Sequence, residues 1–366
     1  MNERLVNLFC DMVRIDSESG DETRFIETLR ERLERELGAD CEFDDYGNLI
    51  AHVKALGSEA APVFLAGHGD TVKPGKGIVP VIEDGVIRSE GETILGADDK
   101  AGIAAILEAV HTAARRPAVD IVITRGEEVG LLGAKHLDTA KLRATAGVVV
   151  DTDALDEVIL GGPTHATLNV EIVGKAAHAA MPEHGVSAIR VAAQAITRFE
   201  EGKLDPETVA NVGTIHGGMI RNGVPEKVVI QAECRSLRDE KCIAQAEKMR
   251  DAFVGAAEEA GATAHVELDY AYQATKVDEN APLVRVAKEA IASVGLEPKA
   301  QVILGGTDAL VLTGRGLDAV VLGFGGKKAH STDEHIAVAD LETASEILRH
   351  LLERLADGLD APKARS

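Results

Sequence analysis

The sequence has no tryptophan, three tyrosines and seven phenylalanines, so aromatic residues make up only 3% of its 366 residues. Basic residues are also few: 39 Lys and Arg stand against 61 Asp and Glu, for a formal net charge of −22. Nucleic acids and anionic lipid surfaces are bound through basic patches, and single strands also through aromatic stacking. We therefore expect neither nucleic acid nor membrane surfaces as partners.

Cysteine and long apolar runs are scarce as well. The four cysteines form no CxxC pair, which is typical of reduced thiols and not of a disulfide framework. No stretch of 18 apolar residues occurs, and Arg4 and Asp11 interrupt the apolar N-terminal segment, which therefore does not resemble a secretory signal. These absences predict a soluble, cytoplasmic protein.

The apolar residues that are present, 45% of the chain, follow clear periodic patterns. The length favours two domains. Amphipathic helices are expected near 5–15 and 25–33, a further helix at 103–116, and buried strands at 63–66, 121–124 and 148–150. Strands that alternate with helices predict an α/β catalytic domain, with a mostly parallel sheet and helices on both faces. Residues 1–163 form its first part.

The pattern changes after residue 163. Residues 165–173 alternate strictly between apolar and polar, and the later elements follow in the order helix, strand, strand, helix, strand. This βαββαβ order predicts an inserted ferredoxin-like α+β domain with an antiparallel sheet over 164–275. The α/β pattern then returns in 276–366, with strands at 302–304 and 319–322, a C-terminal helix, and a frayed tail at 357–366.

Five short segments bring together side chains that can bind metal. Each is expected just after a predicted strand, where open α/β sheets bind ligands. The segments are GHGDT at 67–71, LGADDKAG at 95–102, TRGEEVG at 124–130, VDTD at 150–153 and AHSTDEH at 329–335. Each alone has an ordinary explanation, such as a helix cap, a solvated helix end or a surface histidine. Together, their carboxylates could not all stay ionised at one sheet edge unless cations neutralised them.

Two histidines with three or four carboxylates suit a pair of divalent ions about 3.5–4 Å apart. The period of two along a strand places Asp70 on the same side as His68, where its carboxylate could accept from the far ring nitrogen. Glu127 and Glu128 are adjacent and point in different directions, so one could bind metal while the other transfers protons.

These motifs resemble those of metallopeptidase family M20, which includes peptidase T, carboxypeptidase G, acetylornithine deacetylase and aminoacylase. The matching motifs run in family order: GHGDTV, LGADDKAGIAAI, TRGEEVG, VVDTDA, GKAAHAAMP, GGTDA and HSTDE. The run GADDKAG is similar to that of peptidase T-like members, whereas the deacetylases tend to carry a DMKGG-type run.

The resemblance implies a zinc-peptidase-like catalytic domain with two metal ions. His68, Asp98 and Asp151 would hold one ion, and Asp98, Glu128 and His330 the other, with Asp98 bridging. Zinc is the expected metal. Manganese and cobalt are alternatives, because His and carboxylate ligands without thiolate suit all three.

The resemblance also implies that Glu127 is the general base that takes a proton from the bridging water and passes it to the leaving amine, while Asp70 orients His68.

Three ligand positions have a close competitor in the sequence. Asp99 competes with Asp98, Asp153 with Asp151, and His335 with His330.

Two residues of the inserted domain match family positions. His178 resembles a histidine that reaches the active site of a dimer partner, where it can donate to the developing oxyanion. Arg235 resembles a clamp for the substrate carboxylate, which suits its bidentate guanidinium. A surface ion pair of Arg235 with Glu233 or Asp239 is an equal alternative.

Two loops resemble substrate-contact segments. They contain Asn222, within RNGVP, and Gly306 and Thr307, within GGTD. Both loops would serve equally well as ordinary turns.

The sequence therefore predicts a dinuclear metallohydrolase, homodimeric through the inserted lid and dimerisation domain. Its substrate is a short peptide or an N-acyl amino acid. A tripeptide aminopeptidase is the main prediction. The alternatives are an N-acyl amino acid deacylase, similar to acetylornithine deacetylase or aminoacylase, and a carboxypeptidase G-like enzyme. A non-catalytic relative is disfavoured, because the base position at Glu127 and all five ligand positions are filled.

Overall fold

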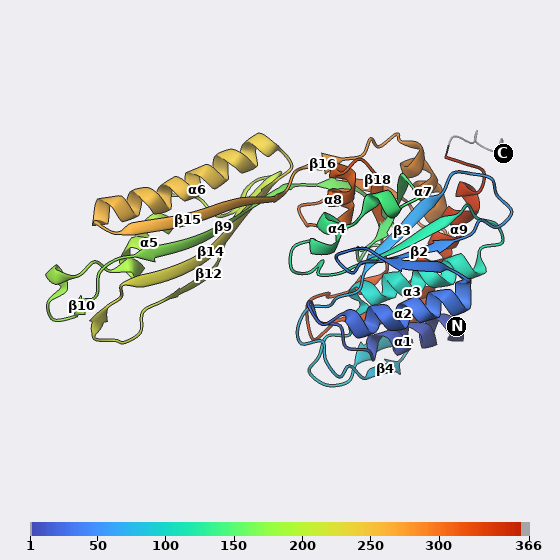
Figure 1. Ribbon diagram of the computed structural model, residues 1–366, viewed down its shortest axis with the longest axis horizontal. Coiled ribbons are helices and arrows are strands. Elements are labelled where there is room, and N and C mark those ends of the chain that lie inside the picture. Colours follow the sequence, from blue (N-terminus) through green and yellow to red (C-terminus); the bar gives the residue numbers. More distant parts are fainter. Residues whose placement is uncertain (1, 360–366) are drawn as a thin grey trace. The chain divides into compact units, whose positions relative to one another are not determined.

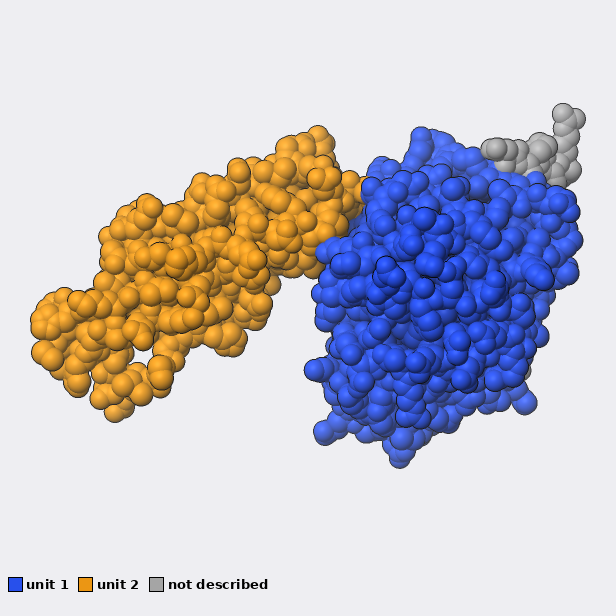
Figure 2. Space-filling view, viewed as in Figure 1, with its two compact units in different colours: residues 1–161, 276–302, 307–366 blue, residues 162–275, 303–306 orange. Residues whose placement is uncertain are grey.

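In the computed structural model, which describes residues 2–359, the chain divides into two units (Figure 2). Within the described residues, the first unit comprises 2–161, 276–302 and 307–359, and the second comprises Gly162–Thr275 and Ile303–Gly306. The boundaries drawn from the sequence differ from this division by two residues near 162 and by the segment 303–306. Residues 360–366 of the tail that we expected to be frayed lie outside the described residues.

The first unit is built on a central sheet, of which Figure 1 labels β2, β3, β16 and β18. The strand order of this sheet is β1-β2-β6-β3-β7-β18-β8-β16, and β17 pairs with β8. The four neighbours β6, β3, β7 and β18 are parallel, whereas β1 and β2 pair antiparallel at one edge. This confirms the predicted largely parallel sheet. The strands are β1 (Asp40–Phe43), β2 (Leu49–Val53), β3 (Val63–His68), β6 (Val119–Thr124), β7 (Ala146–Val150), β8 (Glu157–Gly162), β16 (Thr275–Lys276), β17 (Lys299–Val302) and β18 (Asp318–Leu322).

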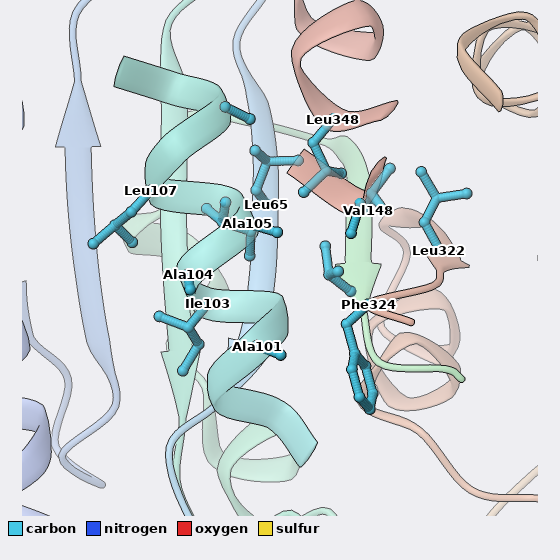
Figure 3. Close-up of a cluster of buried hydrophobic side chains, with 14 of the residues drawn as sticks. Leu65, Ala101, Ile103, Ala104, Ala105, Leu107, Val148, Leu322, Phe324 and Leu348 are labelled. Carbon is cyan, nitrogen blue, oxygen red and sulfur yellow. The ribbon is translucent and has the colours of Figure 1, made fainter. Parts of the chain in front are cut away.

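Helices pack on the central sheet according to the alternation of its side chains. Leu65 and Val148 belong to one buried cluster with residues of the helix α3 and with Leu348 (Figure 3). Successive strand residues point to opposite faces, so Phe64 and Ala66 lie on the other face, and α8 packs against β18 and β7. The helices are α1 (Glu3–Val13), α2 (Thr23–Leu37), α3 (Ala97–Thr112), α4 (Leu132–His136), α7 (Pro282–Ser293), α8 (Asp308–Gly314) and α9 (Val338–Leu355), with a 3₁₀ turn at Thr139–Lys141.

Two expected elements differ at their ends. The helix predicted over 103–116 is α3, which begins six residues earlier, with a kink at Asp98 and Asp99, and ends at Thr112, because Ala113 leaves the helical conformation. The strand expected at 302–304 is β17, which begins earlier, at Lys299, and ends at Val302, where its pairing with β8 stops.

A second, four-stranded sheet with the order β19-β20-β5-β4 also forms in the first unit. Its strands are β4 (Pro80–Glu83), β5 (Val86–Ser89), β19 (Gly326–Lys327) and β20 (His335–Ala337). Strands of two to four residues carry no readable period, so this sheet was not predicted. It matters for the site because β19 and β20 hold the loop that contains His330.

The second unit contains an antiparallel sheet of order β11-β12-β14-β9-β15. One face of β9, with Leu168, Val170 and Ile172 fully buried, packs against α5 and α6, as the strict alternation indicated. The predicted element order is present, with the edge strand β11 and a short β10–β13 pair added. The elements are β9 (Thr164–Val173), β10 (Ala177–His178), a 3₁₀ turn (Pro182–His184), α5 (Ala188–Ile196), β11 (Gly202–Asp205), β12 (Thr208–Gly217), β13 (Gly223–Val224), β14 (Lys227–Ser236), α6 (Asp239–Ala260) and β15 (Thr263–Tyr272).

Two findings bear on the composition of the chain. All four cysteines are free thiols. Among residues 2–359, no helix combines the length and the apolar character that crossing a membrane requires.

Candidate metal centre

The candidate site lies where three parallel strands end side by side. His68 is the last residue of β3, Glu127 and Glu128 follow the end of β6, and Asp151 directly follows β7. Because β6, β3 and β7 are adjacent and parallel, their carboxyl ends meet at one edge of the sheet. Four chemically active side chains that are far apart in the sequence are thereby brought together.

Asp98 comes to the same edge from the start of α3. Gly96 adopts a φ of +71°, in the left-handed region, and turns the chain into the helix. Asp98 itself has a non-helical conformation, with φ −81° and ψ 107°. Asp99 is non-helical as well, with φ −114° and ψ 27°, so the regular helix starts after Asp99 and the Asp98 carboxylate is free to point into the site.

The Asp98 carboxylate lies between the two histidines. His68 Nε2 is 3.1 Å from Asp98 Oδ1, and His330 Nε2 is 3.3 Å from Asp98 Oδ2. On the one side, His68 Nε2 is also 3.7 Å from Asp151 Oδ1; on the other, His330 Nε2 is 3.0 Å from Glu128 Oε2. The five predicted ligands thus form two groups of three that share Asp98.

The carboxylates around the two histidines raise the pKa values of both imidazoles. Asp98 and Glu128, as hydrogen-bond partners, raise the pKa of His330 to about 10. Burial lowers the pKa of His68, but Asp151, Asp70 and Asp98 outweigh it and raise that pKa well above the ordinary value. The same carboxylates that raise these two pKa values would favour cations at this position.

The acidic groups show how strongly the site demands positive charge. Burial, reinforced by the charges of Asp98 and Glu128, raises the pKa of Asp151 to about 6 despite its hydrogen bond with His68. Burial also raises the pKa of Glu127 well above its ordinary value, with Asp151 and Asp308 adding to the effect. A carboxyl group with a raised pKa is suited to general acid and base work near neutral pH.

Asp70 connects several parts of the site. Its carboxylate accepts hydrogen bonds from Ser19 Oγ at 2.7 Å and from the backbone amides of Glu127 at 2.9 Å and Glu128 at 3.3 Å. His68 Nδ1 is 3.5 Å from this carboxylate, whereas the Asp70 carbonyl oxygen is nearer, at 3.0 Å. Asp70 therefore fixes the two glutamates through their backbone as well as contacting His68.

The geometry separates the competing ligand positions. Asp99 turns away from the two Nε2 atoms, and its Oδ2 accepts from the His68 backbone amide at 3.2 Å. Asp153 is exposed, and within the described residues its carboxylate forms no hydrogen bond or ion pair with either histidine ring. His335 lies on β20, and its Nδ1 bonds to the Asp333 carbonyl. Asp98, Asp151 and His330 are the members that face the shared centre.

In the second unit, the structure brings two of the predicted residues together and places the third elsewhere. His178 pairs with Gly223 across the β10–β13 ladder, next to Asn222, whose carbonyl accepts from Ala179 N. Both His178 and Asn222 are exposed. Arg235 lies on β14, away from this pair.

Arg235 forms the ion pair that the sequence left open as an alternative. Its Nη2 is 3.1 Å from Glu233 Oε2, and its Nη1 donates to the Leu304 carbonyl at 3.3 Å. The buried Nε has no hydrogen-bond partner among the described residues.

The loop before α8 contains one predicted contact residue and one residue that sequence reasoning missed. Thr307 is the N-cap residue of α8 and is buried, with no hydrogen-bond partner for its Oγ1 among the described residues. Asp308 accepts from Thr124 Oγ1, and burial raises its pKa to about 7. Gly306 lies just before them, in the second unit. Asp308 was visible in the GGTDA motif, but nothing in the motif showed that it stands close enough to influence Glu127.

The residues fit a pair of divalent cations. Two imidazole Nε2 atoms each face one oxygen of the same carboxylate, the arrangement in which Asp98 can bridge two ions. Ligand atoms of His68, Asp98 and Glu128 lie within 4.8 Å of one another. In addition, the buried Glu128 Oε1 has no hydrogen-bond partner among residues 2–359, as expected of an oxygen whose partner is a metal.

Comparison with known proteins identifies the class. The model of peptidase family M20/M25/M40 matches residues 64–354. A protein of Bacillus subtilis strain 168, YqjE, whose name describes it as uncharacterized, is 38% identical over 368 aligned residues, which cover 97% of this chain and 99% of that protein. The chain belongs to peptidase family M20/M25/M40, and it is a hydrolase of the metallopeptidase class.

Two solved structures are similar over nearly the whole length. Aminopeptidase PepT from Bacillus cereus ATCC 10987 is 40% identical with a TM-score of 0.86, over 97% of this chain and 98% of that one. A tripeptidase from Staphylococcus aureus subsp. aureus mu50 is 35% identical with a TM-score of 0.91, over the same shares of the two chains. The predicted resemblance to peptidase T-like proteins is thereby confirmed.

Proposed function

We propose that this chain is an aminopeptidase that cleaves the first amide bond of short peptides, tripeptides in particular. The observation that carries the proposal is the Asp98 carboxylate between His68 and His330, with Glu127 at the same sheet edge. The preference for peptides is supported by the similarity to an aminopeptidase and to a tripeptidase.

His68, Asp98 and Asp151 would hold one divalent ion, and Asp98, Glu128 and His330 the other. Zinc is the proposed metal, with manganese or cobalt as alternatives for this donor set. When bound, such ions supply the positive charge that polarises the scissile carbonyl and lowers the pKa of water.

Glu127 is the general base of the proposed reaction. Its carboxylate takes the proton of the attacking water and delivers it to the leaving amine. Asp70 holds Glu127 in place through the backbone amide, 2.9 Å from Asp70 Oδ1. A base position that is fixed by the backbone is preorganised for proton transfer.

Residues of the inserted domain and of the loop before α8 supply substrate contacts in this proposal. Arg235 binds the peptide carboxylate through guanidinium donors, Asn222 and Gly306–Thr307 contact the peptide backbone, and His178 donates to the developing oxyanion. Because His178 is exposed on the second unit, it is suited to act on the active site of a partner protomer.

A homodimer formed through the second unit is part of this proposal. Met219 and Ile220 are 96% and 68% exposed, and Ile215 and Met181 are 49% and 47% exposed. Large exposed apolar side chains that gather on one unit are typical of a protein interaction surface.

A substrate panel tests the proposal. The purified protein, loaded with Zn²⁺, Mn²⁺ or Co²⁺, is incubated with Ala-Ala-Ala, Ala-Ala, N-acetyl-Ala-Ala-Ala and N-acetylalanine, with and without a chelator. We expect Ala-Ala-Ala to be cleaved to alanine and Ala-Ala, the acetylated peptide to resist, and the chelator to abolish turnover. Hydrolysis of N-acetylalanine without cleavage of Ala-Ala-Ala would establish a deacylase instead.

A further inference from the structure

Glu334 is a buried carboxylate close to the candidate metal centre. It lies four residues after His330, in the segment between β19 and β20, and is 2% exposed. Its Oε2 accepts from the Gly96 amide at 2.7 Å, and its Oε1 accepts from the Asp98 amide at 3.0 Å. Both carboxylate oxygens are thus used by the backbone of the turn that presents Asp98.

The turn at residues 96–98 has backbone N–H groups that can donate to Glu334. Gly96 and Asp98 come before the first regular turn of α3, so their N–H groups have no carbonyl partner within the helix. A carboxylate that accepts from such amides also complements the positive end of the helix dipole. Hydrogen bonds of this charge-assisted kind are stronger than neutral ones. Glu334 therefore holds the backbone of Asp98 while the Asp98 side chain remains free for the site.

The loop that carries His330 needs an external support. Lys328 and His330 both adopt left-handed conformations, with φ values of 57° and 63°. Inside the loop, Ser331 Oγ donates to the Lys328 carbonyl at 2.8 Å, and the Glu334 amide donates to the Ser331 carbonyl at 3.0 Å. The His330 side chain is 55% exposed, so side-chain packing contributes little to its position.

A closed ring of contacts results. Glu334 holds the Asp98 backbone, the four-residue segment leads back to His330, and His330 Nε2 reaches Asp98 Oδ2 at 3.3 Å. If the loop moved, His330 would move away from Asp98 Oδ2. His68 is outside this ring, because the strand β3 holds it in the central sheet.

We infer that Glu334 is a positioning residue that sets the distance between His330 and Asp98, and thereby the affinity of the centre for the ion on the His330 side. The inference rests on the proposed two-metal centre. It assigns to Glu334 an unequal effect on the two ions. Both His330 and Asp98 belong to the ring, whereas the ion on the His68 side shares only Asp98 with it and keeps His68 and Asp151, at the ends of β3 and β7.

Metal titration of the chelator-stripped protein tests this inference. Glu334→Gln removes the charge and replaces one acceptor by a donor, and Glu334→Asp keeps the charge but is too short for both amides. Asp333→Asn is the matched control, because Asp333 is adjacent in sequence but exposed, with its carboxylate on Lys328. Each protein is titrated with Zn²⁺ by calorimetry and with Co²⁺ by its visible absorption, which reports the ligand geometry.

We expect both Glu334 variants to lose about 10–100-fold in affinity for one of two ions, as is typical for partners of metal ligands. The second ion keeps its affinity within about 2-fold, and Asp333→Asn titrates like the original protein. The inference would be overturned if both Glu334 variants bound the two ions with the affinities of the original protein. It would also be overturned if the affinities for both ions fell equally. Variants that do not fold would also overturn it, because Glu334 would then be a general structural residue. An original protein that binds no ion would refute the proposed metal centre itself.

Discussion

The two halves of the candidate metal centre are built in different ways. His68 ends a central strand, is 1% exposed, and lies between Asp98 and Asp151. His330 lies in a loop, in a left-handed conformation, and is 55% exposed. The sheet itself holds the first half, whereas a single loop and the Glu334 contacts hold the second.

This difference teaches that one centre can combine a rigid and an adjustable half. A ligand at the end of a buried strand is positioned by the packing of the whole sheet. A ligand on a surface loop depends on a few local contacts, and such segments open at lower free-energy cost. The His330 half is therefore expected to bind and release its ion more readily than the His68 half.

The largest expected effect comes from removing the general base, Glu127, which belongs to neither group of metal ligands. Glu127→Ala should lower kcat for Ala-Ala-Ala by at least about 10²–10⁴-fold, since it removes the base, while both ions bind as before. Steady-state kinetics and metal analysis of the same sample check this. Glu346→Ala, an exposed glutamate on α9, is the matched control and should keep its activity. A Glu127 variant with ordinary turnover would remove the assigned mechanism.

The next largest effect is expected in the affinity for one of the two ions when the loop ligand His330 is removed. His330→Ala should leave one tightly bound ion per chain, because only the loop ligand is lost and the His68 half is intact. The affinity for the other ion should fall by more than about 100-fold, since outer partners of ligands alone cost 10–100-fold. His335→Ala, five residues further on, should bind two ions. If His335→Ala and not His330→Ala loses an ion, the assignment of the loop ligand is wrong.

A smaller effect is expected in the kinetics of metal removal. When the loaded protein is mixed with a colorimetric chelator, release should occur in two phases of about one ion each. The fast phase belongs to the exposed His330 half, and His330→Ala should lack it. If both ions were released in one phase at one rate, the two halves would not differ in their release rates, contrary to what the burial of His68 and the exposure of His330 indicate.

The smallest expected effect is a pH dependence of the free energy of unfolding, which arises from the buried carboxyl group of Asp308. Burial raises the folded-state pKa of Asp308 from 3.8 to about 7, so the folded chain retains a proton that the unfolded chain has released. In metal-free protein, this contribution to the free energy of unfolding is complete below pH 3.8 and is lost as pH rises toward 7. Relative to Asp308→Asn, the original protein should therefore lose stability over this range, by at most about 1.4 kcal/mol per pH unit. Denaturant unfolding with chelator checks this, and a pH-independent difference contradicts it.

Much of the fold could be predicted, because its signals are local and regular. Short β-branched runs at 63–66, 121–124 and 148–150 became the parallel strands β3, β6 and β7. Strict alternation at 165–173 became the half-buried strand β9. The short strands of the sheet β19-β20-β5-β4 were missed, because two to four residues are too few to show a period.

The candidate site could be predicted as far as its motifs extend. His68, Asp98, Glu128, Asp151 and His330 each stand in a recognisable segment, and parallel strand ends explain how most of them meet. Sequence could not show how the ligands are held in place. Glu334 was part of HSTDE, but its contacts with the Gly96 and Asp98 amides depend on the folding of two loops that are more than 200 residues apart.

Ser19 and Asp308 illustrate the same limit. Ser19 donates to Asp70, but no motif surrounds it, so nothing marked it as part of the site. Asp308 stood in a motif, yet its effect on Glu127 arises from burial and proximity that only the packed structure defines. Contacts of this kind depend on tertiary packing, for which a single sequence carries no direct signal.

The central claim is a centre of two unequal halves that together support amide hydrolysis. The most direct test titrates Zn²⁺ into chelator-stripped protein while following both ion binding and Ala-Ala-Ala hydrolysis. We predict two ions per chain, with different affinities, and full activity only when the second equivalent is bound. Full activity in the presence of chelator, or saturation without any bound ion, would contradict the account.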